Sequence, residues 1–486
     1  MAVRLRDYQE HGIADLRAAI ADGARAPLYV LPTGGGKTTV FGELSRRSIV
    51  KGRRVVVLAH RKELVEQAAG RLRLLGLNPG LIMPGGTPGD GSSYCASVQT
   101  LVRDIGAIEP PDLLICDEAH HAPAGSWQAI RQAWPNATYL GVTATPIRLD
   151  GRGLGDAFDR MVLGPSAREL TERGYLVPAD VFCPSVPDLA GLRTRCGDWT
   201  TADLEKAIAE SSIVGDAVQS FRQHVPSGSA VAFCASVAHA RVTAAAFEAA
   251  GIRAAVLTGG DKKEHREAVL DGLASGAIRI LCSVDVISEG FDLPDIRAAI
   301  LLRPTKSLGL YLQQVGRALR PADGKTAAII LDHAGNALRH GLPAEDRQWS
   351  LDGIQAGARE TTHTEGGEAL SVRQCLTCYA IHPSGPVCPY CGTGHPRDDR
   401  IPRQRAGELR RLEAEEAARL EEERKAEAKA ARVLPRFVFE KMAKSKGWKP
   451  GQAGEAHRRH VEKKAKAAGR DGGSSVRQAD WLQGRL

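Results

Sequence analysis

The sequence contains no long hydrophobic run. None of its 486 residues belongs to a stretch of about 18 consecutive apolar residues, so we expect no membrane-spanning helix and no membrane partner. The charged segment 1–10 also lacks the apolar core of a signal peptide, which argues against export. With 43% hydrophobic and 25% charged residues, the composition is that of a globular protein. Its length predicts roughly three or four domains.

Net charge is absent from most of the chain. The first 432 residues are formally neutral, and the whole excess of +8 lies in residues 433–486, which hold 13 Lys or Arg against 5 Asp or Glu. A basic tail on a neutral body favours contact with a polyanion. A solvated tail without such a contact is the alternative that the sequence leaves open.

Clustered cysteine is also scarce, with one exception. Six of the ten cysteines lie singly, mostly in apolar stretches, which is typical of reduced core residues in a reducing compartment. The other four, Cys375, Cys378, Cys388 and Cys391, form two Cys-x-x-Cys pairs separated by nine residues. Four thiolates at this spacing can surround one Zn²⁺, which would supply the folding energy of so short a segment. Two disulfides or a redox pair are the alternatives, and whether such a ribbon binds nucleic acid or a partner, or only braces the fold, stays open.

A glycine-rich turn follows an apolar run at residues 28–31 and precedes a helical pattern. Three successive glycines let backbone N–H groups point inward, and the helix N-terminus behind them favours an anion. This context predicts a phosphate-binding loop, in which Lys37 reaches the β- and γ-phosphates and Thr38 holds Mg²⁺. Leu31 departs from the small residue of the strict pattern, and an ordinary turn is the alternative. The predicted nucleotide-binding residues of this loop are Thr33, Gly34, Gly35, Gly36, Lys37 and Thr38.

Two adjacent carboxylates, Asp117 and Glu118, follow a buried strand expected at 113–116. Their repulsion is costly unless a cation or a proton separates their roles. Asp117 would hold Mg²⁺, while Glu118 would orient and deprotonate an attacking water. Gln9, 28 residues before Lys37, could present its amide to an adenine edge, although taken alone it is more typical of a surface residue.

Arg317 and Arg320 are three residues apart and share one face of a predicted helix. Planar guanidinium groups can fork onto phosphate oxygens. Supplied from a second lobe, they would act as arginine fingers on a γ-phosphate bound by the first. Hydrolysis would then require closure of the two lobes. A solvated basic helix is the alternative.

Short apolar strands alternate with amphipathic helices in both halves of the chain, which predicts parallel α/β sheets. The expected strands include 55–59, 113–116, 139–142, 230–234, 253–257, 278–282 and 327–331, with a further strand edge at 97–101. We expect a first domain at 1–160, a hinge at 161–190, a second domain at 191–350, a flexible linker at 351–372, a zinc ribbon at 373–396, a charged helix at 400–434 and a basic tail at 435–486.

Residues 141–151 read Gly-Val-Thr-Ala-Thr-Pro-Ile-Arg-Leu-Asp-Gly, and with the preceding motifs the chain resembles the superfamily-two helicases and translocases of the DEAH type. The subgroup includes type III restriction helicase subunits and phage or prophage DNA helicases, and the match runs through residues 3–345. Residues 283–294 are similar to the fifth motif of that family. The resemblance implies two tandem RecA-like domains with ATP and Mg²⁺ between them. It places Gly290, Asp292 and Gln313 near the nucleotide, with His120, Thr143 and Thr145 coupling the motifs.

The same resemblance implies a nucleic-acid path across both lobes, with DNA favoured over RNA. Contact through phosphates implies weak sequence preference and an affinity that falls steeply with salt. A nuclease or a replication or repair factor would fit as a protein partner, in the cytoplasm of a bacterium or of a phage-infected host. The candidate backbone contacts, carried over by motif position, are His60, Arg61, Gln99, Thr100, Ser236 and Ser283.

The segment 403–432 is dense in Glu, Arg, Lys and Ala, and its three large apolar residues are too sparse for a heptad seam. A single exposed helix with i,i+4 ion pairs is therefore expected. In the tail, Phe437, Phe439 and Trp448 are interleaved with basic residues, a pattern that can combine stacking with phosphate contact. A small helical hairpin without that role is the alternative.

Together these features predict an ATP-dependent helicase or translocase. A second hypothesis is a motor subunit of a restriction or defence complex that pumps duplex DNA without separating its strands. The sequence has no recognisable nuclease constellation, so any cutting would need a partner. A third hypothesis is a zinc-dependent nucleic-acid binding adaptor with a degenerate motor, although a competent residue fills every expected catalytic position.

Overall fold

The computed structural model describes residues 4–87, 89–148, 150–184, 189, 191–195, 198–209, 213–284, 295–353 and 372–394, with Glu455 and Arg459. The chain divides into units 1–397 and 398–486, and the first contains both sheets. The predicted charged helix, nearly all of the basic tail, and Gly290 and Asp292 lie outside the described residues. Within the described part, every helix is too short or too polar to cross a membrane.

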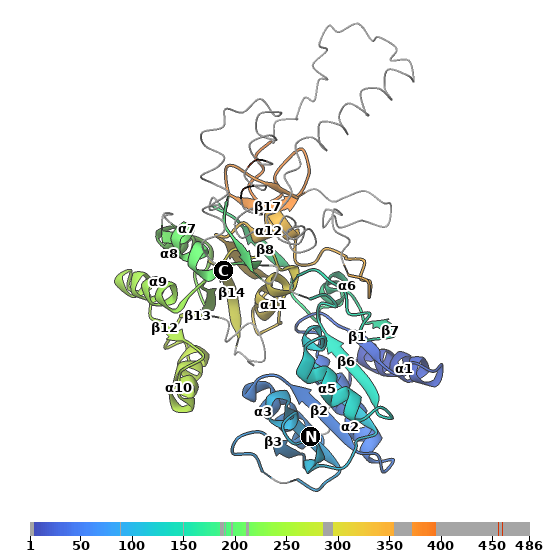
Figure 1. Cartoon of the computed structure of the whole chain (residues 1–486). Coiled ribbons are helices and arrows are strands. Elements are labelled where there is room, and N and C mark those ends of the chain that lie inside the picture. Colours follow the sequence, from blue (N-terminus) through green and yellow to red (C-terminus); the bar gives the residue numbers. More distant parts are fainter. Residues whose placement is uncertain are drawn as a thin grey trace, which may run out of the picture. The chain divides into compact units, whose positions relative to one another are not determined.

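The first lobe is built on a seven-stranded sheet with the strand order β3-β4-β2-β5-β6-β1-β7, and every pairing in it is parallel. Its four strands β2, β5, β6 and β1 are buried almost throughout, as expected for a parallel sheet between helices, whereas the edge strand β7 is partly exposed. These are the blue to cyan elements of Figure 1. The strands are β1 Pro27–Val30, β2 Val55–Ala59, β3 Gly80–Ile82, β4 Ser93–Ser97, β5 Leu113–Asp117, β6 Thr138–Thr143 and β7 Arg160–Leu163.

Helices cover both faces of this sheet. The apolar residues of α1, α2 and α3 share one cluster with alternate strand residues, and those of α4 and α5 share another cluster with the remaining strand residues. The period of two along each strand therefore supplies both layers. The helices are α1 Asp7–Ala21, α2 Lys37–Ile49, α3 Lys62–Leu74, α4 Val98–Leu101 and α5 Gly125–Ala133, with short 3₁₀ turns η1 Ile105–Ala107 and η2 Ala119–His121.

The strand expected at 97–101 was wrong, because the strand here lies earlier in the chain. Strand β4 ends at Ser97, and the next four residues form the single turn α4. Val98 and Leu101 are three residues apart and both are fully buried, so one helical turn brings both side chains into the same core. The short apolar segment is compatible with the period of a strand and with that of a helix, and the packing of Val98 and Leu101 favours the helix.

The second lobe contains an eight-stranded sheet with the order β12-β13-β11-β14-β15-β8-β17-β16. Its first six strands are parallel, whereas β17 pairs antiparallel with β8, and β16 pairs antiparallel with β17. The strands are β8 Ala179–Phe182, β11 Ser229–Phe233, β12 Ala254–Leu257, β13 Ile280–Ser283, β14 Ile296–Leu301, β15 Ala328–Asp332, β16 Val372–Gln374 and β17 Ala380–Pro383. A separate antiparallel pair is β9 Thr194–Arg195 with β10 Asp198–Trp199.

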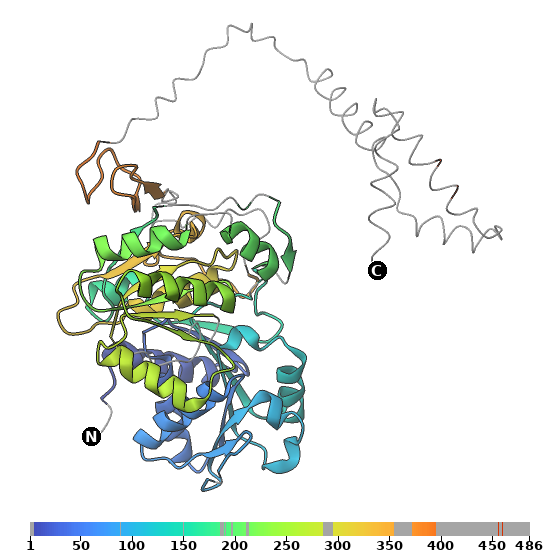
Figure 2. The ribbon, with the colours of Figure 1, turned by 90° about the vertical axis from the view of Figure 1, so that its left-hand side faces the viewer.

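Helices again cover both faces of the second sheet, and Figure 2 shows the green helices of this lobe from the side. Residues of α8 and α9 pack in one cluster on the sheet, while residues of α10 and α11 pack in the cluster on its other face. The helices are α6 Ala167–Glu172, α7 Thr201–Ala209, α8 Ile213–His224, α9 Val237–Ala249, α10 Lys263–Ala274, α11 Leu308–Ala318 and α12 Asn336–His340.

The connection between the two sheets is short. Strand β7 ends in the first sheet at Leu163, and β8 spans Ala179–Phe182 in the second sheet, so part of the range 161–190 expected as a hinge belongs to the two sheets. Between them lies α6, and the N–H of Val177 donates to the carbonyl of Leu319 at 2.9 Å. This connection is therefore held against the end of α11.

Candidate functional site

The glycine-rich turn lies between β1 and α2, where the sequence predicts a phosphate-binding loop. Gly34 and Gly36 have φ of 87° and 86°, a conformation that glycine adopts without strain. Gly36 is the N-cap of α2, whose first residue is Lys37. Leu31 is fully buried, and a Cβ at Gly35 would lie 2.8 Å from its Cγ. Leu31, the residue that departs from the strict pattern, is therefore buried beneath the loop and packs against Gly35.

The Lys37 side chain enters a strongly charged environment. Its Nζ donates to the Leu31 carbonyl at 3.5 Å, the outer limit of a hydrogen bond. Burial lowers the pKa of Lys37, while Glu118 and Asp117 raise it and Arg317 and Arg320 lower it further. Three cations thus surround the same space as two carboxylates, which is an arrangement suited to a polyanion with a metal ion.

The acid pair terminates β5. Asp117 and Glu118 are each 7% exposed, and the N–H of Glu118 donates to Asp117 Oδ1 at 3.0 Å. Glu118 has a φ of 50°, a left-handed conformation that is rare outside glycine and found preferentially at functional sites. Its Oε2 lies 3.5 Å from His120 Nδ1. The left-handed residue Glu118 thus ends the strand and caps the 3₁₀ turn η2.

Thr143 and Thr145 form a buried hydroxyl turn after β6. Thr143 Oγ1 donates to the Thr145 carbonyl at 3.0 Å and accepts from the Thr145 N–H at 3.2 Å. Strand β6 pairs with β5, so this turn follows the strand beside the acid pair. A Cβ at Gly309 would lie 3.0 Å from Thr145 Oγ1, which places the start of α11 against the turn. The turn thus connects the neighbourhood of the acid pair with the second lobe.

The loop, the acid pair and the two arginines line one cavity of about 450 Å³. Its walls therefore come from both lobes. Beside α3 residues, the lining includes Thr33, Gly34, Gly36, Lys37, Thr38, Asp117, Glu118, Arg317 and Arg320.

Helix α11 approaches the loop very closely. A Cβ at Gly316 would lie 2.5 Å from Thr33 Cβ, and a Cβ at Gly34 would lie 3.6 Å from Arg320 Cγ. Gly316 is therefore required for the observed contact between the lobes. Gln313, on the same helix, is 4% exposed but is not among the residues that line the cavity.

Gln9 is buried rather than on the surface, being 4% exposed. Its Nε2 donates to the Gly35 carbonyl at 3.3 Å, and its Oε1 accepts from the Arg6 N–H at 3.0 Å. The neighbouring Tyr8 hydroxyl donates to the same Gly35 carbonyl at 2.8 Å. The first turn of α1 thus supports the loop from below.

Two residues of this site were not found from the sequence. Tyr8 supports the loop, and Arg71 of α3 lines the cavity and donates through Nη2 to Thr39 Oγ1 at 2.7 Å. Arg71 lies in the last turn of a surface helix, and no motif marks it. Tyr8 precedes Gln9 directly, so the position of Gln9 was the signal that could have found it.

The candidate nucleic-acid contacts of the first lobe lie together. His60 and Arg61 follow β2, and Gln99 and Thr100 follow the paired strand β4. Arg61 Nε donates to His60 Nε2 at 3.2 Å, and the rings of His60 and His121 are 4.2 Å apart. This polar edge lies at the carboxyl ends of the strands, where open α/β sheets bind ligands.

The corresponding residues of the second lobe are less accessible. Ser236 caps α9, accepting from the His239 N–H at 3.2 Å, and is 8% exposed. Ser283 ends β13 and is 1% exposed. Each hydroxyl would need a local rearrangement to meet a phosphate. Arg266 of α10 instead forms an ion pair with Glu63 of α3 across the two lobes.

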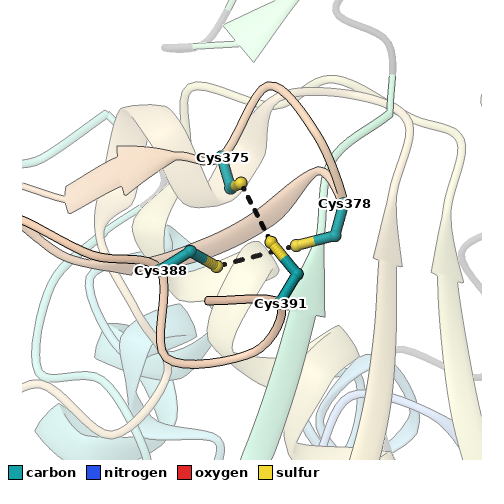
Figure 3. A group of neighbouring side chains, drawn as sticks. All are labelled: Cys375, Cys378, Cys388 and Cys391. Atoms are coloured by element: carbon teal, nitrogen blue, oxygen red, sulfur yellow. Dashed lines mark hydrogen bonds between the residues drawn. The ribbon is translucent and has the colours of Figure 1, made fainter. Parts of the chain in front are cut away.

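The four clustered cysteines meet at one point (Figure 3). Their sulfur atoms all lie within 4.8 Å of one another, with Cys375 Sγ 3.6 Å from Cys391 Sγ and Cys378 Sγ 3.7 Å from Cys388 Sγ. Zn–S bonds of about 2.3 Å in a tetrahedron give sulfur–sulfur edges of about 3.8 Å, so the group fits a zinc ion. All four are free cysteines, which does not support the disulfide alternative.

The electrostatics of this group differ between its members. Hydrogen bonding with Thr393 lowers the pKa of Cys391 to about 6, whereas burial raises the pKa of Cys378 to about 12. The group is joined to the second sheet by β17, and the Tyr390 hydroxyl donates to Asp180 Oδ1 at 3.2 Å. The cysteine segment is thus an extension of the second lobe.

Comparison with known proteins gives matches in both lobes. Residues 2–148 match the family described as type III restriction enzyme, res subunit, and residues 213–322 match the helicase conserved C-terminal domain. A 51.5 kDa protein of a Lactococcus phage is 33% identical over 362 residues, covering 74% of this chain and 76% of the phage protein.

Other relatives are more distant. The candidate ATP-dependent helicase IRC3 of Saccharomyces cerevisiae is 28% identical, and the match covers 68% of this chain and 51% of the yeast protein. The DNA 3'-5' translocase XPB2 of Sulfurisphaera tokodaii is 26% identical, with coverage of 69% and 83%. In structure, a fragment of a candidate HsdR subunit of a type I restriction enzyme from Vibrio vulnificus shares the fold, with a TM-score of 0.55, 21% identity and coverage of 69% and 65%. The chain belongs to the superfamily-two helicases, whose phage and restriction-enzyme members it resembles.

Proposed function

We propose that this chain is an ATP-driven motor that moves along or unwinds DNA, with ATP and Mg²⁺ in the cavity between the lobes. One observation carries the proposal: Lys37, the acid pair and the two arginines line the same cavity from opposite lobes. Neither lobe alone supplies all the groups that phosphoryl transfer to water requires.

The residues divide the work by their chemistry. Backbone N–H groups of the loop and the Lys37 ammonium bind the phosphates, and Arg317 and Arg320 stabilise charge on the departing phosphoryl group. Glu118 orients a water and accepts its proton. Thr38 and Asp117 would hold Mg²⁺, which neutralises charge on the phosphate oxygens when it is bound. Gln9 is placed beside the loop, where its amide would reach an adenine edge only by releasing Gly35.

The close packing of α11 on the loop could couple nucleotide exchange to movement of the second lobe. Gly316 lies against Thr33, and Gly309 lies against the Thr143–Thr145 turn. A change in the loop on nucleotide exchange would push directly on α11 and hence on the second lobe. Because the lobes would each contact the strand, their relative motion would become movement along DNA.

DNA as the substrate is supported by the kinship with a protein named as a DNA translocase. We place the strand over His60, Arg61, Gln99 and Thr100, whose neighbouring strands bring them to one edge. Contacts of this kind go to phosphates, so binding would show little sequence preference and would weaken as salt increases.

A second candidate function is the motor of a restriction or defence complex, favoured by the match to the res subunit family over residues 2–148. Such a motor would pump duplex DNA and depend on a partner nuclease for cutting. Displacement of a labelled strand from a fork would indicate unwinding. Displacement of a third strand from a triplex, without strand separation, would indicate pumping.

The direct test of the first function uses Lys37→Ala and Glu118→Gln, with Lys51→Ala as a control because Lys51 is exposed and away from the cavity. Both site variants should reduce DNA-stimulated phosphate release to background while DNA binding persists, and the control should match the parent. Normal turnover in both site variants would end the assignment.

We also propose Zn²⁺ at the four cysteines, in keeping with a reducing cytoplasm. Metal analysis of the purified chain should find one zinc per molecule. Cys378→Ser should lose it, whereas Cys183→Ala, outside the cluster, should retain it. A chain that is fully folded and free of zinc, as judged by metal analysis and circular dichroism, would contradict the proposal.

A further inference from the structure

Lys325 is a buried lysine near the end of α11, the helix that carries Arg317 and is followed by Arg320. It lies in the connection between α11 and β15 and is 7% exposed. Its Nζ donates to three backbone carbonyls, those of Ile296, Ala318 and Arg320, with the last two at 2.6 and 2.9 Å. An ammonium group has three N–H donors, so all of them are used.

Two of these acceptors belong to the C-terminal end of α11. Ala318 is the last residue of the helix, and Arg320 follows two residues later. The final carbonyls of a helix have no intrahelical partner and carry the negative end of the helix dipole. A cation at this point therefore satisfies orphan acceptors and is electrostatically favourable. It also fixes the backbone of Arg320, whose side chain lines the cavity.

The third acceptor connects the helix end to the sheet. Ile296 begins β14, and the next residue, Arg297, donates through Nη1 and Nη2 to the carbonyls of Gly324 and Asp323 at 2.7 and 2.6 Å. Lys325 thus reaches from the turn to β14, while Arg297 reaches from β14 to the turn. These two reciprocal sets of bonds clamp the end of α11 onto the sheet.

Placing a lysine here has a cost. Burial lowers the pKa of Lys325 to about 8, while Asp295 raises it and Arg297 and Arg320 lower it further. An apolar side chain would avoid this desolvation but would leave three buried carbonyls with one donor fewer each. What the lysine provides, therefore, is a fixed position for the segment that holds Arg317 and Arg320.

We propose that Lys325 is a positioning residue for ATP hydrolysis, which holds the C-terminal end of α11 so that Arg317 and Arg320 reach the nucleotide cavity. The proposal rests on the assignment of that cavity as the ATP site. Lys325 does not line the cavity itself, so its effect on the reaction passes through the arginines.

The test is a double-mutant cycle in the full chain, with Lys325→Met, Arg320→Ala and the double variant. Lys325→Met should lower kcat for DNA-stimulated ATP hydrolysis about 10- to 100-fold, because the guanidinium is displaced, while KM for ATP changes less than about twofold. The loss of kcat in the double variant should be smaller than the product of the two single losses, because both changes affect the placement of the Arg320 guanidinium. Lys51→Met serves as the exposed-lysine control.

The outcomes separate the two proposals. If Arg320→Ala leaves kcat unchanged, the proposed role of the arginine fails. If Arg320→Ala lowers kcat but Lys325→Met does not, or if the two losses multiply in the double variant, only the positioning role fails. Should Lys325→Met not fold by circular dichroism, Lys325→Arg decides: recovery of at least half the parental kcat supports the role, and a loss equal to that of Arg320→Ala in a folded chain contradicts it.

Discussion

Each lobe carries a lysine whose pKa is lowered by burial, and the two are engaged differently. Lys37 of the first lobe makes a long hydrogen bond of 3.5 Å and faces a cavity with two carboxylates. Lys325 of the second lobe gives all three donors to backbone carbonyls. The first is arranged to exchange partners with a ligand, whereas the second is arranged to keep them. We infer from this comparison that the first lobe binds the nucleotide, while the second lobe holds its two arginines on a fixed segment of backbone.

The largest effect that would sharpen this comparison is removal of an arginine. Arg317→Ala or Arg320→Ala should lower kcat about 10³-fold, because charge in the transition state loses its partner from the second lobe. Affinity for ATP should fall much less, since the loop and Lys37 remain. Steady-state phosphate release and equilibrium binding of a fluorescent ATP analogue measure the two quantities.

Arg241→Ala is the matched control, because Arg241 is exposed on α9 of the same lobe. If the arginine variants lost ATP binding and turnover in equal proportion, the division of labour between the lobes would be wrong.

A smaller loss is expected from Gly316→Ala. The new Cβ would lie 2.5 Å from Thr33 Cβ, so α11 must shift away from the loop. A displacement of this size should lower kcat about 10- to 100-fold without removing any charged group. Gly260→Ala is the control, because no atom lies within 4 Å of a Cβ placed there. Parental kcat in Gly316→Ala would show that the close approach of the lobes is not needed for turnover.

The smallest effect concerns pH. Between about pH 8 and the ordinary lysine pKa of 10.5, Lys325 binds fewer protons when folded than when unfolded. The contribution of this group to folding stability therefore increases as pH rises through that window. Turnover should change in the opposite direction, falling a few-fold, because a neutral amine holds the carbonyls less strongly.

The pH–rate profile of Lys325→Arg gives the contrast, since a guanidinium stays charged throughout. The charged groups around Lys325 are Asp295, Arg297 and Arg320. A profile for Lys325→Arg that declines as steeply as that of the parent would assign the decline to another group.

Local sequence was sufficient to predict much of the first lobe. Glycine, lysine and threonine in one turn, and two carboxylates after a buried strand, each have a chemistry that the surrounding strand and helix make usable. The expectation that Arg317 and Arg320 share one helical face was wrong in part, because α11 ends at Ala318 and Arg320 lies just beyond it. Both residues nevertheless line the cavity. Motifs of this kind are short-range, so their geometry follows from their own elements.

The remaining features depend on contacts between distant segments. Arg71 reaches the cavity only because α3 packs beside α2, and no pattern around it signals this. The pairing of β17 with β8 joins segments almost 200 residues apart, and an antiparallel addition to a parallel sheet has no local signature. No sequence pattern marks Lys325, because its three acceptors come from the ends of other elements.

The most direct measurement is an experimental structure of the chain with Mg²⁺ and ADP–aluminium fluoride, a mimic of the phosphoryl group in transfer. We predict that the fluorine atoms, which stand for the oxygens of the phosphoryl group, accept hydrogen bonds from Lys37 on one side and from Arg317 or Arg320 on the other. Glu118 should lie beside the attacking water. Nucleotide bound by the first lobe alone, with both guanidinium groups turned out of the cavity, would contradict it.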